Sequence, residues 1–597
     1  MLMQSLESIL ASPITNAIKS LFGANVEPSS IVFSKTNPQF EGDLTLVVFP
    51  YVKLAGKGPE QTAELIGDFL KNAVPQISSY NIVKGFLNIV FHDDFWKQQI
   101  NEIIPIEDFG IKKVLPSAPF VMVEYSSPNT NKPLHLGHIR NILLGHSISQ
   151  ILKADGKKVM MVNLVNDRGI HICKSMLAWQ KWGNGENPKS SGLKGDHLVG
   201  KYYVEFNKHF KSEVEILVKA GSTIEEAEKK APLILEAQEM LQKWEAGEES
   251  VKKLWELMNN WVYDGFTQTY NNLGVAFDKT YYESNTYLLG KEIIEDGLAK
   301  NVFVKRPDGA VIIDLKAEKL DEKVLLRSDG TAVYMTQDLG TAVERHKEFP
   351  FDKHIYVVGN EQEYHFKVLK LTLEKLGLDW AKGLFHLSYG MVELPDGKMK
   401  SREGTVVDAD ELIVAMERSA IELSDQRGLV DGMTEDEKNK LAHMVGMAAL
   451  KYFILKVDPH KKMLFDPKES IDLHGNTGPF IQYTHARIRS ILKKSGLKDI
   501  PAIDLSISIH PKEKELIKQL FGFPTAITEA ANTYSPASLA NYTYELAKLF
   551  NQFYDVCSVL KEENVAIKNF RLALSYSVAR TIKSAFLMLG IDVPERM

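Results

Sequence analysis

The chain has 597 residues, 25% charged and 44% hydrophobic, which is the composition of a soluble globular protein with room for roughly four domains. Its 71 basic and 77 acidic residues give a net charge of −6, so any RNA contact must use local basic surface. Only Cys173 and Cys557 are present, which excludes a disulfide framework and a cysteine zinc site, and no apolar run approaches the ~20 residues of a membrane span.

Residues 1–112 are predicted to form a small α/β unit. The opening segment has helical periodicity and lacks the basic leader of a secretory signal, so we expect a cytoplasmic protein without membrane attachment. Strands are expected at 31–33, 44–50 and 85–91, and a helix at 58–72. Alternation in the third strand places Phe86 and Asn88 on one face, where an exposed strand residue is the simpler interpretation of Asn88.

A strand, a tight turn and a helix follow one another from Phe120 to Leu143. The apolar run 120–125 is typical of a buried parallel strand, a turn rich in Pro and Asn follows, and helical spacing begins near residue 134. His135 and His138 lie at the start of this helix with Gly137 between them, where imidazole N–H groups could stabilise a transferring phosphate. Two alternatives remain open: the two histidines could be metal ligands, although no third ligand lies nearby, or they could be ordinary surface residues.

The next strand, at 159–165, ends in Asn166, Asp167 and Arg168, at the edge of a parallel sheet where ligands bind. Residues 175–290 form a highly charged helical region without a catalytic motif, which we interpret as an insertion that splits the α/β domain. The sheet is expected to resume at 325–331, with further strands at 354–358 and 386–391.

Three cations, Lys398, Lys400 and Arg402, lie in a Gly-flanked loop after the last of these strands. An exposed, solvated turn is the usual interpretation of such a loop, and the second half of a phosphate site is the alternative. From about residue 408, where Asp408 can cap a helix, nearly all of the chain is predicted to be helical, with helices at 411–427, 482–493, 539–560 and 570–589.

Two carboxylates from separate segments, Glu124 and Asp338, suggest a pocket for a cationic substrate. Tyr334 precedes Asp338 by four residues, so on a helix both side chains face the same way. Together with Gln362 they could surround a guanidinium, whose five donors need that many acceptors. Structural salt bridges would explain either acid equally well.

Seven stretches give the sequence a full-length resemblance to the arginyl-tRNA synthetases, class I enzymes of the bacterial cytosolic type. They are VEYSSPNTNKPLHLGHIRN, VNDRGIHICKSM, LRSDGTAVYMTQDLGTA, IYVVGNEQEYHF, GKMKSREGT, TGPFIQYTHARIRSIL and LGIDVPERM. The resemblance implies a Rossmann-like catalytic domain at 113–410 with the helical insertion at about 175–290, an N-terminal α+β domain at 1–112 that contacts the tRNA D-arm, a connecting region at 411–474, and an all-α anticodon-binding domain at 475–597.

The resemblance also assigns roles to individual residues. The catalytic residues would be His135, His138, Lys132, Lys398, Lys400 and Arg402. ATP would contact Gly137, both histidines, Met391, Val392, Lys398, Met399 and Ser401, and arginine would contact Glu124, Asn129, Tyr334, Asp338 and Gln362. Phe86, Asn88, Tyr483 and Arg487 would contact tRNA. The basic loop departs from the family's KMSKS motif, because Ser401 stands at its second lysine, and Lys132 or Arg402 would compensate.

The implied reaction activates L-arginine with ATP and Mg²⁺ to arginyl-adenylate and then transfers arginine to tRNA(Arg). The family further implies a monomer that needs tRNA before activation and no protein-bound metal. Rival interpretations are a glutaminyl or cysteinyl synthetase, a small nucleotidyltransferase, and a catalytically dead paralogue that acts as an RNA-binding scaffold. The absence of a cysteine zinc site argues against the cysteinyl enzyme. The helical C-terminal region argues against the nucleotidyltransferase. The intact histidines, carboxylates and basic loop argue against the dead paralogue.

Overall fold

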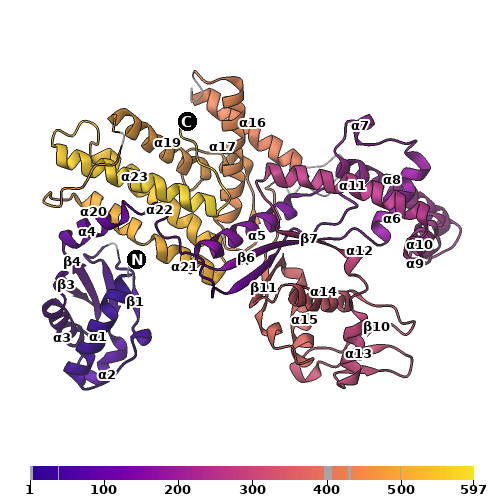
Figure 1. Ribbon diagram of the computed structural model, residues 1–597, viewed down its shortest axis with the longest axis horizontal. Helices are drawn as coiled ribbons and strands as arrows, with labels where there is room; N and C mark the ends of the chain where they lie inside the picture. The colour runs from indigo at the N-terminus through magenta and orange to yellow at the C-terminus, as the bar shows by residue number, and fades with distance from the viewer. Residues whose placement is uncertain (1–4, 38, 396–406, 428–431, 498) are drawn as a thin grey trace.

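The computed structural model describes residues 5–37, 39–395, 407–427, 432–497 and 499–597 (Figure 1). A central parallel sheet lies between a projecting helical insertion and a group of C-terminal helices, and the N-terminal sheet region packs against those C-terminal helices. Within these ranges no helix has the length and apolar character needed to cross a membrane.

The N-terminal unit is an antiparallel sheet of order β1-β2-β4-β3 covered by helices. Its strands are β1 Phe33–Ser34, β2 Leu44–Val47, β3 Ile77–Val83 and β4 Phe86–Phe91, and its helices are α1 Leu6–Phe22, α2 Val52–Ala55, α3 Pro59–Ala73 and α4 Asp93–Ile103. Strand β3 was not predicted, because its sequence ISSYNIV carries little hydrophobic alternation. Strand β2 ends earlier than expected, at Val47, and a 3₁₀ turn follows at Phe49–Tyr51.

Five parallel strands form the central sheet in the order β12-β11-β5-β6-β7. They are β5 Phe120–Glu124, β6 Lys158–Val165, β7 Lys279–Tyr282, β11 Lys353–Gly359 and β12 Leu384–Tyr389. Helix α5 Leu136–Ala154 connects β5 to β6, whereas β11 lies on the other side of β5. The strand order therefore reverses beside β5, which opens a crevice at the carboxyl edge of the sheet.

Both faces of this sheet are buried. Val123 and Val357 belong to the large core that includes α5, and Met122 and Val162 to a second core on the opposite face. That second face is covered by α14 Tyr334–Glu348 and α15 Glu363–Lys375. The apolar runs of the sequence reflect this burial on both sides.

The insertion between β6 and β7 is helical, as predicted, but it ends before residue 279. It contains α6 Ile170–Trp182, α7 Pro188–Ser191, α8 Gly195–Lys219, α9 Ile224–Lys230, α10 Pro232–Glu245 and α11 Glu249–Asn272. Strand β7 thus lies inside the range 175–290 that the sequence assigned to the insertion. Its four residues, KTYY, are too short and polar to stand out as a sheet strand.

The segment at 325–331 does not resume the parallel sheet, which corrects the sequence prediction. A separate antiparallel sheet of order β10-β9-β8 contains β8 Phe303–Lys305, β9 Val311–Ile313 and β10 Lys323–Leu326, preceded by α12 Glu283–Thr286 and α13 Lys291–Ala299. The two leucines at 325–326 gave an apolar signal, but a turn at Gly330 with φ of 80° ends the segment.

Among the described residues after β12, the regular elements are helices and one two-residue strand pair, β13 Val392–Glu393 with β14 Met463–Leu464. The helices are α16 Ala409–Arg427, α17 Glu435–Leu455, α18 Pro467–Ser470, α19 Gly478–Ser495, α20 Pro511–Phe521, α21 Phe523–Thr533, α22 Pro536–Val556 and α23 Val565–Met588. Asp408 caps α16 as predicted, since its Oδ1 accepts from the backbone N–H of Asp410 at 2.9 Å.

Residues 588–594 lie against helices of two regions. The hydroxyl of Ser147, on α5, donates to the carbonyl of Met588 at 3.0 Å. Gln482 donates to the carbonyl of Asp592 at 2.7 Å, and His485 to the carbonyl of Pro594 at 2.9 Å. The end of α23 and the segment after it therefore join α19 to the helix that carries the two predicted catalytic histidines.

The packing of α5 against the turn after β5 gives a stability prediction. A Cβ added at Gly145 would lie 2.3 Å from the Cβ of Tyr125, which is itself fully buried. We expect Gly145→Ala to lower the free energy of unfolding by about 1–3 kcal/mol, the usual cost of overpacking a core. Gly522→Ala is the matched control, because its Cβ would meet nothing closer than 3.4 Å. Equal denaturation midpoints for the two variants would contradict this packing.

Candidate active site

The two histidines at the start of α5 are locked into one arrangement by the helix terminus. His135 is the N-cap residue, and its Nδ1 accepts from the backbone N–H of Gly137 at 3.2 Å. The Nδ1 of His138 accepts in turn from the N–H of His135 at 3.2 Å, and the ring centroids lie 3.8 Å apart. Because both Nδ1 atoms accept, each neutral ring carries its proton on Nε2, which is left to donate to a ligand.

Both imidazoles are held neutral at physiological pH. Burial, together with the charge of Lys132, lowers the pKa of His135 to about 4. Burial, with His135 and Lys132 adding to it, holds the pKa of His138 well below its ordinary value. Burial also lowers the pKa of Lys132, which has no ion-pair partner among the described residues. Two N–H donors and an amine therefore meet at the positive end of a helix, which is an arrangement suited to anionic oxygens.

The turn after β5 is strained and is fixed by two asparagines. Ser126 and Ser127 have φ of 76° and 45°, in the left-handed region that non-glycine residues rarely adopt. The side-chain oxygen of Asn141, on α5, accepts from the N–H of Ser126, and that of Asn163, on β6, accepts from Ser127 at 3.0 Å. These contacts bring Pro128 and exposed Asn129 beside Asn166, at the end of β6.

The described residues on both sides of the basic loop contact the start of α5 and its cap. After the loop, Val407 accepts from the N–H of Leu136 at 2.9 Å, and Asp408 bridges to His135. Before it, the carbonyl of Met391 accepts from Arg140, on α5, at 3.2 Å, and Val392 pairs with Met463. The loop residues predicted to be catalytic, Lys398, Lys400 and Arg402, and those predicted to contact ATP, Lys398, Met399 and Ser401, lie outside the described residues.

An ion network ties the end of that loop to the insertion. Lys194 pairs with Asp410 and, at 3.2 Å, with Asp196, and His197 Nε2 lies 3.1 Å from Asp410. The oxygens and nitrogen of Asp196, His197 and Asp410 are close enough together to hold a metal ion. The ammonium of Lys194 lies within the same group and supplies positive charge to both carboxylates.

Of the predicted arginine-binding residues, Glu124 has a different environment from the one expected. It is buried and paired with Arg345 on α14, and its other oxygen accepts from Ser127 at 3.4 Å. This internal guanidinium already compensates the carboxylate, so the geometry favours a structural role for Glu124. The binding role inferred for it from the sequence stays a prediction.

Asp338 and Tyr334 both lie on α14, as predicted from their spacing. Asp338 accepts from His365 Nε2 at 2.7 Å and remains partly exposed, Tyr334 is 76% exposed, and Gln362 is exposed on the 3₁₀ turn that follows β11. These groups line the side of the crevice formed by α14 and β11. Asn129 stands on the turn after β5 at the same edge of the sheet.

A further carboxylate, Glu283, was missed by the sequence analysis. It follows β7 directly, at the start of α12, and burial raises its pKa to about 7, with Asp167 and Asp338 adding to the shift and Arg168 opposing it. Glu283 and Asp338 are therefore close enough to repel each other, and a cation between them would relieve this repulsion. The signal was present, because a polar residue follows a strand, but the strand itself was assigned to the insertion.

The predicted tRNA contacts divide into accessible and buried residues. Phe86 is 38% exposed and packs edge-on against exposed Phe49. Asn88 is instead buried, accepting from Thr45 at 2.6 Å and donating to Asn81 at 2.8 Å, so it cannot reach a base without breaking both bonds. This corrects the expectation for Asn88, since loop residues cover the strand face that alternation had marked as exposed.

Tyr483 and Arg487 lie together on α19. The guanidinium carbon of Arg487 stands 4.9 Å from the centroid of the Tyr483 ring and 5.7 Å from that of Tyr554 on α22. Arg487 also donates to Asn551 at 2.6 Å. Two partly accessible aromatic rings beside an arginine form a surface on which unpaired bases can stack.

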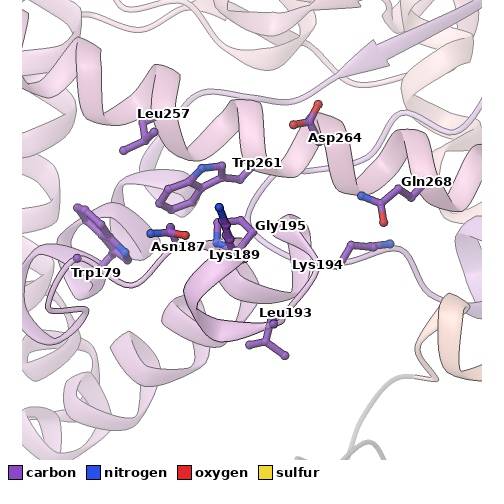
Figure 2. A pocket seen from close by; sticks show the side chains of 13 residues that line it. Trp179, Asn187, Lys189, Leu193, Lys194, Gly195, Leu257, Trp261, Asp264 and Gln268 are labelled. Carbon is purple, nitrogen blue, oxygen red and sulfur yellow. The ribbon is translucent and has the colours of Figure 1, made fainter.

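The insertion contains a pocket of about 950 Å³ (Figure 2), and neither His135 nor His138 is among the residues that line it. Its walls come from α6, α8 and α11 and the loop between α6 and α8, and they include the indoles of Trp179 and Trp261, whose ring centroids lie 5.9 Å apart. Lys194 borders this pocket and also pairs with Asp410, so the pocket and the end of the basic loop share a residue.

Comparisons with known proteins agree with this architecture. Residues 101–466 match the family described as tRNA synthetases class I (R), catalytic domain, and residues 481–597 match the DALR anticodon binding domain. The chain is 56% identical to the arginine–tRNA ligase of Bacteroides thetaiotaomicron over 595 residues, covering 99% of this chain and 100% of the relative. It is 53% identical to that of Porphyromonas gingivalis over 599 residues, covering 100% of both. The solved arginyl-tRNA synthetase of Thermus thermophilus superposes with a TM-score of 0.80 at 26% identity, covering 99% of this chain and 100% of that chain.

Proposed function

The chain belongs to the arginyl-tRNA synthetase family of class I tRNA synthetases, and from this membership we propose how its own residues carry out the reaction. The enzyme is an arginine–tRNA ligase with a Rossmann-like catalytic domain and a C-terminal helical anticodon-binding domain. The observation that carries the proposal is the meeting of neutral histidine donors and a carboxylate pair at one edge of the parallel sheet.

The histidine side of the crevice binds the nucleotide, supplied as the Mg²⁺ complex of ATP. The Nε2–H groups of His135 and His138 donate to the phosphates, and Lys132 contributes charge. Gly137 leaves room for the nucleotide beside the helix, and the segment at Met391 and Val392 lies beside the adenine. Lys398, Lys400 and Arg402 contribute positive charge toward the pyrophosphate, and Met399 and Ser401 contact the nucleotide.

In the first step, a carboxylate oxygen of arginine attacks the α-phosphorus in line, and the bond from that phosphorus to the bridging oxygen breaks. Arginyl-adenylate and pyrophosphate result. In the second step, a hydroxyl of the terminal adenosine of tRNA attacks the arginyl carbonyl carbon, and AMP leaves. No side-chain nucleophile is needed, because positioning and the stabilisation of developing charge supply the catalysis.

The opposite side of the crevice binds arginine. Asp338 and Glu283 receive the guanidinium, and Tyr334 and Gln362 complete its set of acceptors. Asn129 lies where it can contact the α-amino or carboxyl end. Support comes from the electrostatics of Glu283: burial is the main cause that raises its pKa, the charge of Asp338 adds to the shift, and a monocation placed between the two carboxylates would favour the ionised form.

The pKa of Glu283 predicts how arginine binding depends on pH. The carboxylate binds the guanidinium only when it is ionised, and burial raises its pKa to about 7 in the free enzyme. We therefore expect kcat/KM for arginine to fall as pH decreases through about 7, approaching tenfold per unit. Glu283→Gln should have a lower value with a flatter acid limb, measured by steady-state kinetics at several pH values. An unchanged acid limb in this variant would assign the titration to another group.

tRNA spans the two ends of the molecule in this proposal. Phe86 of the N-terminal unit stacks at the corner of the tRNA, and Tyr483 and Arg487 contact anticodon bases. By its resemblance to the family, the active form is proposed to be a monomer. The small number of cysteines, both buried, supports a cytoplasmic location.

The test is arginine-dependent exchange between ATP and pyrophosphate, with and without cognate tRNA, against a panel of amino acids. Exchange with arginine only in the presence of tRNA would support both the substrate and the family's dependence on tRNA. Exchange without tRNA would retain the substrate and contradict the dependence. Exchange with another amino acid would overturn the pocket assignment, and no exchange at all would favour an RNA-binding scaffold.

A further inference from the structure

Arg168 lies between the helical insertion and the carboxylate side of the crevice. Its NH2 group donates to Glu245, the last residue of α10, at 2.6 Å, whereas NH1 stands 4.0 Å from an oxygen of Glu283. The guanidinium carbon lies 4.1 Å from the centroid of the Tyr287 ring and 5.6 Å from that of Trp244. One largely buried cation thus touches residues of two segments that are separated in sequence by the whole of α11.

The turn that carries Arg168 is itself held by the insertion. The carbonyl of Asp167 accepts from the indole of Trp255, on α11, at 2.6 Å, and its carboxylate accepts from the hydroxyl of Tyr263, on the same helix, at 2.9 Å. The other carboxylate oxygen accepts from the backbone N–H of Ser284 at 2.8 Å. Asp167 therefore fixes the backbone directly after Glu283, and Arg168 faces the Glu283 side chain from the same turn.

The two distances show how Arg168 divides its contacts. The bond to Glu245 is a short, charge-assisted one, while the contact with Glu283 is too long for a hydrogen bond. Glu283 thus receives the electrostatic benefit of a nearby guanidinium and keeps its oxygens available for another cation. The ion pair with Glu245 and the contact with the Tyr287 ring hold Arg168 away from the position proposed for the substrate guanidinium.

Among the charged groups that act on Glu283, Arg168 is the one of opposite charge. Asp167 and Asp338 oppose ionisation of Glu283, and Arg168 favours it. Asp338 is bonded to His365, and Lys252 lies over the Trp244 ring at 3.3 Å, on the far side of the Arg168 clamp. Without Arg168 three carboxyl groups would face one another with no cation paired to Glu283 among the described residues.

We propose that Arg168, held by Glu245 of the insertion, is a positioning residue for arginine binding that keeps Glu283 ionised and open toward the substrate guanidinium. The proposal rests on the function proposed above, because it needs Glu283 to bind arginine. It also gives the helical insertion a role, since α10 supplies the clamp and α11 holds the turn.

The experiment compares Arg168→Gln, Arg168→Lys, Glu245→Gln and their combination R168Q/E245Q in arginine-dependent exchange, with cognate tRNA present throughout. R168Q should raise the arginine KM by about tenfold or more, with kcat and the KM for ATP within about threefold, and should move the acid limb upward by about one pH unit. R168K, which restores a cation, should return the acid limb toward its original position. Arg306→Gln is the matched control, because Arg306 pairs with Glu322 on the separate small sheet.

The Glu245 variant tests whether the effect on arginine binding passes through Arg168, because Glu245 forms its ion pair with Arg168. E245Q should raise the arginine KM by a smaller factor, and the combined variant should be no worse than R168Q alone. Unchanged arginine KM and acid limb in R168Q, or equal losses for ATP and arginine with a lowered melting temperature, would overturn the proposal. Lack of arginine-dependent exchange in the unmodified enzyme would instead overturn the proposed function.

Discussion

Replacing His138 by alanine should lower kcat for arginine-dependent exchange by about 10²- to 10³-fold, with little change in the arginine KM. The Nε2–H of this partly buried, neutral ring is one of two imidazole donors at the start of α5. Removal of a single preorganised donor to a developing oxyanion costs about 2.7–4 kcal/mol in other enzymes. Because the helix terminus fixes this donor in one arrangement, we expect an effect of that size.

A lost helix cap must be distinguished from a lost catalytic donor, because His138 Nδ1 also accepts from the backbone of His135. The cap alone is worth about 1 kcal/mol of stability, which a melting curve will reveal. His138→Asn retains an amide that can accept and donate, and should recover part of kcat. His474→Ala, at an exposed histidine, is the neutral control. If H138A and H474A had equal kcat, His138 would have no catalytic role.

Replacing Asp338 by alanine should raise the arginine KM or abolish activation, because guanidinium donors would be left unpaired. Truncating one partner of a buried charge pair costs about 2–5 kcal/mol. Asp338 is 38% exposed in the free enzyme, so the lower half of this range applies, which corresponds to a rise of roughly 30- to 300-fold. The measurement is initial-rate exchange at varied arginine concentration.

Two companions make the Asp338 result specific. Asp338→Asn keeps the size of the side chain and removes its charge, so it should reproduce most of the effect. His365→Ala removes the group that donates to Asp338 at 2.7 Å but leaves the carboxylate in place, and should have a smaller effect. Arginine kinetics that are unchanged in D338A would remove Asp338 from the pocket.

The contrast between His138 and Glu283 shows which parts of the site can be predicted from sequence. The histidines are local: a strand, a turn and a helix within about 25 residues place them, and each step has its own pattern in the sequence. Glu283 depends on β7, a four-residue strand that pairs with β6 only after more than 100 intervening residues. Such pairing is decided by tertiary contacts that local propensity does not register.

The burial of polar side chains also could not be predicted from the sequence. The alternation around Asn88 predicted an exposed face correctly for Phe86, but the loop before β2 covers the next position on that face. Likewise Glu124 has the chemistry of a ligand, and only the fold shows that Arg345 from α14 already neutralises it. A sequence identifies which side chains could bind a cation, but the packing of the folded chain decides which partner each of them has.

The contact between Ser147 on α5 and Met588 joins residues 441 positions apart. During synthesis the ribosome adds roughly 5–20 residues per second, so α5 emerges on the order of half a minute before its partner exists. Over that interval the helix that carries the histidines lacks the support supplied by the end of α23. The nascent enzyme therefore acquires its full architecture only as translation nears completion. A chain truncated before residue 588 would lack the contact between α5 and the end of α23.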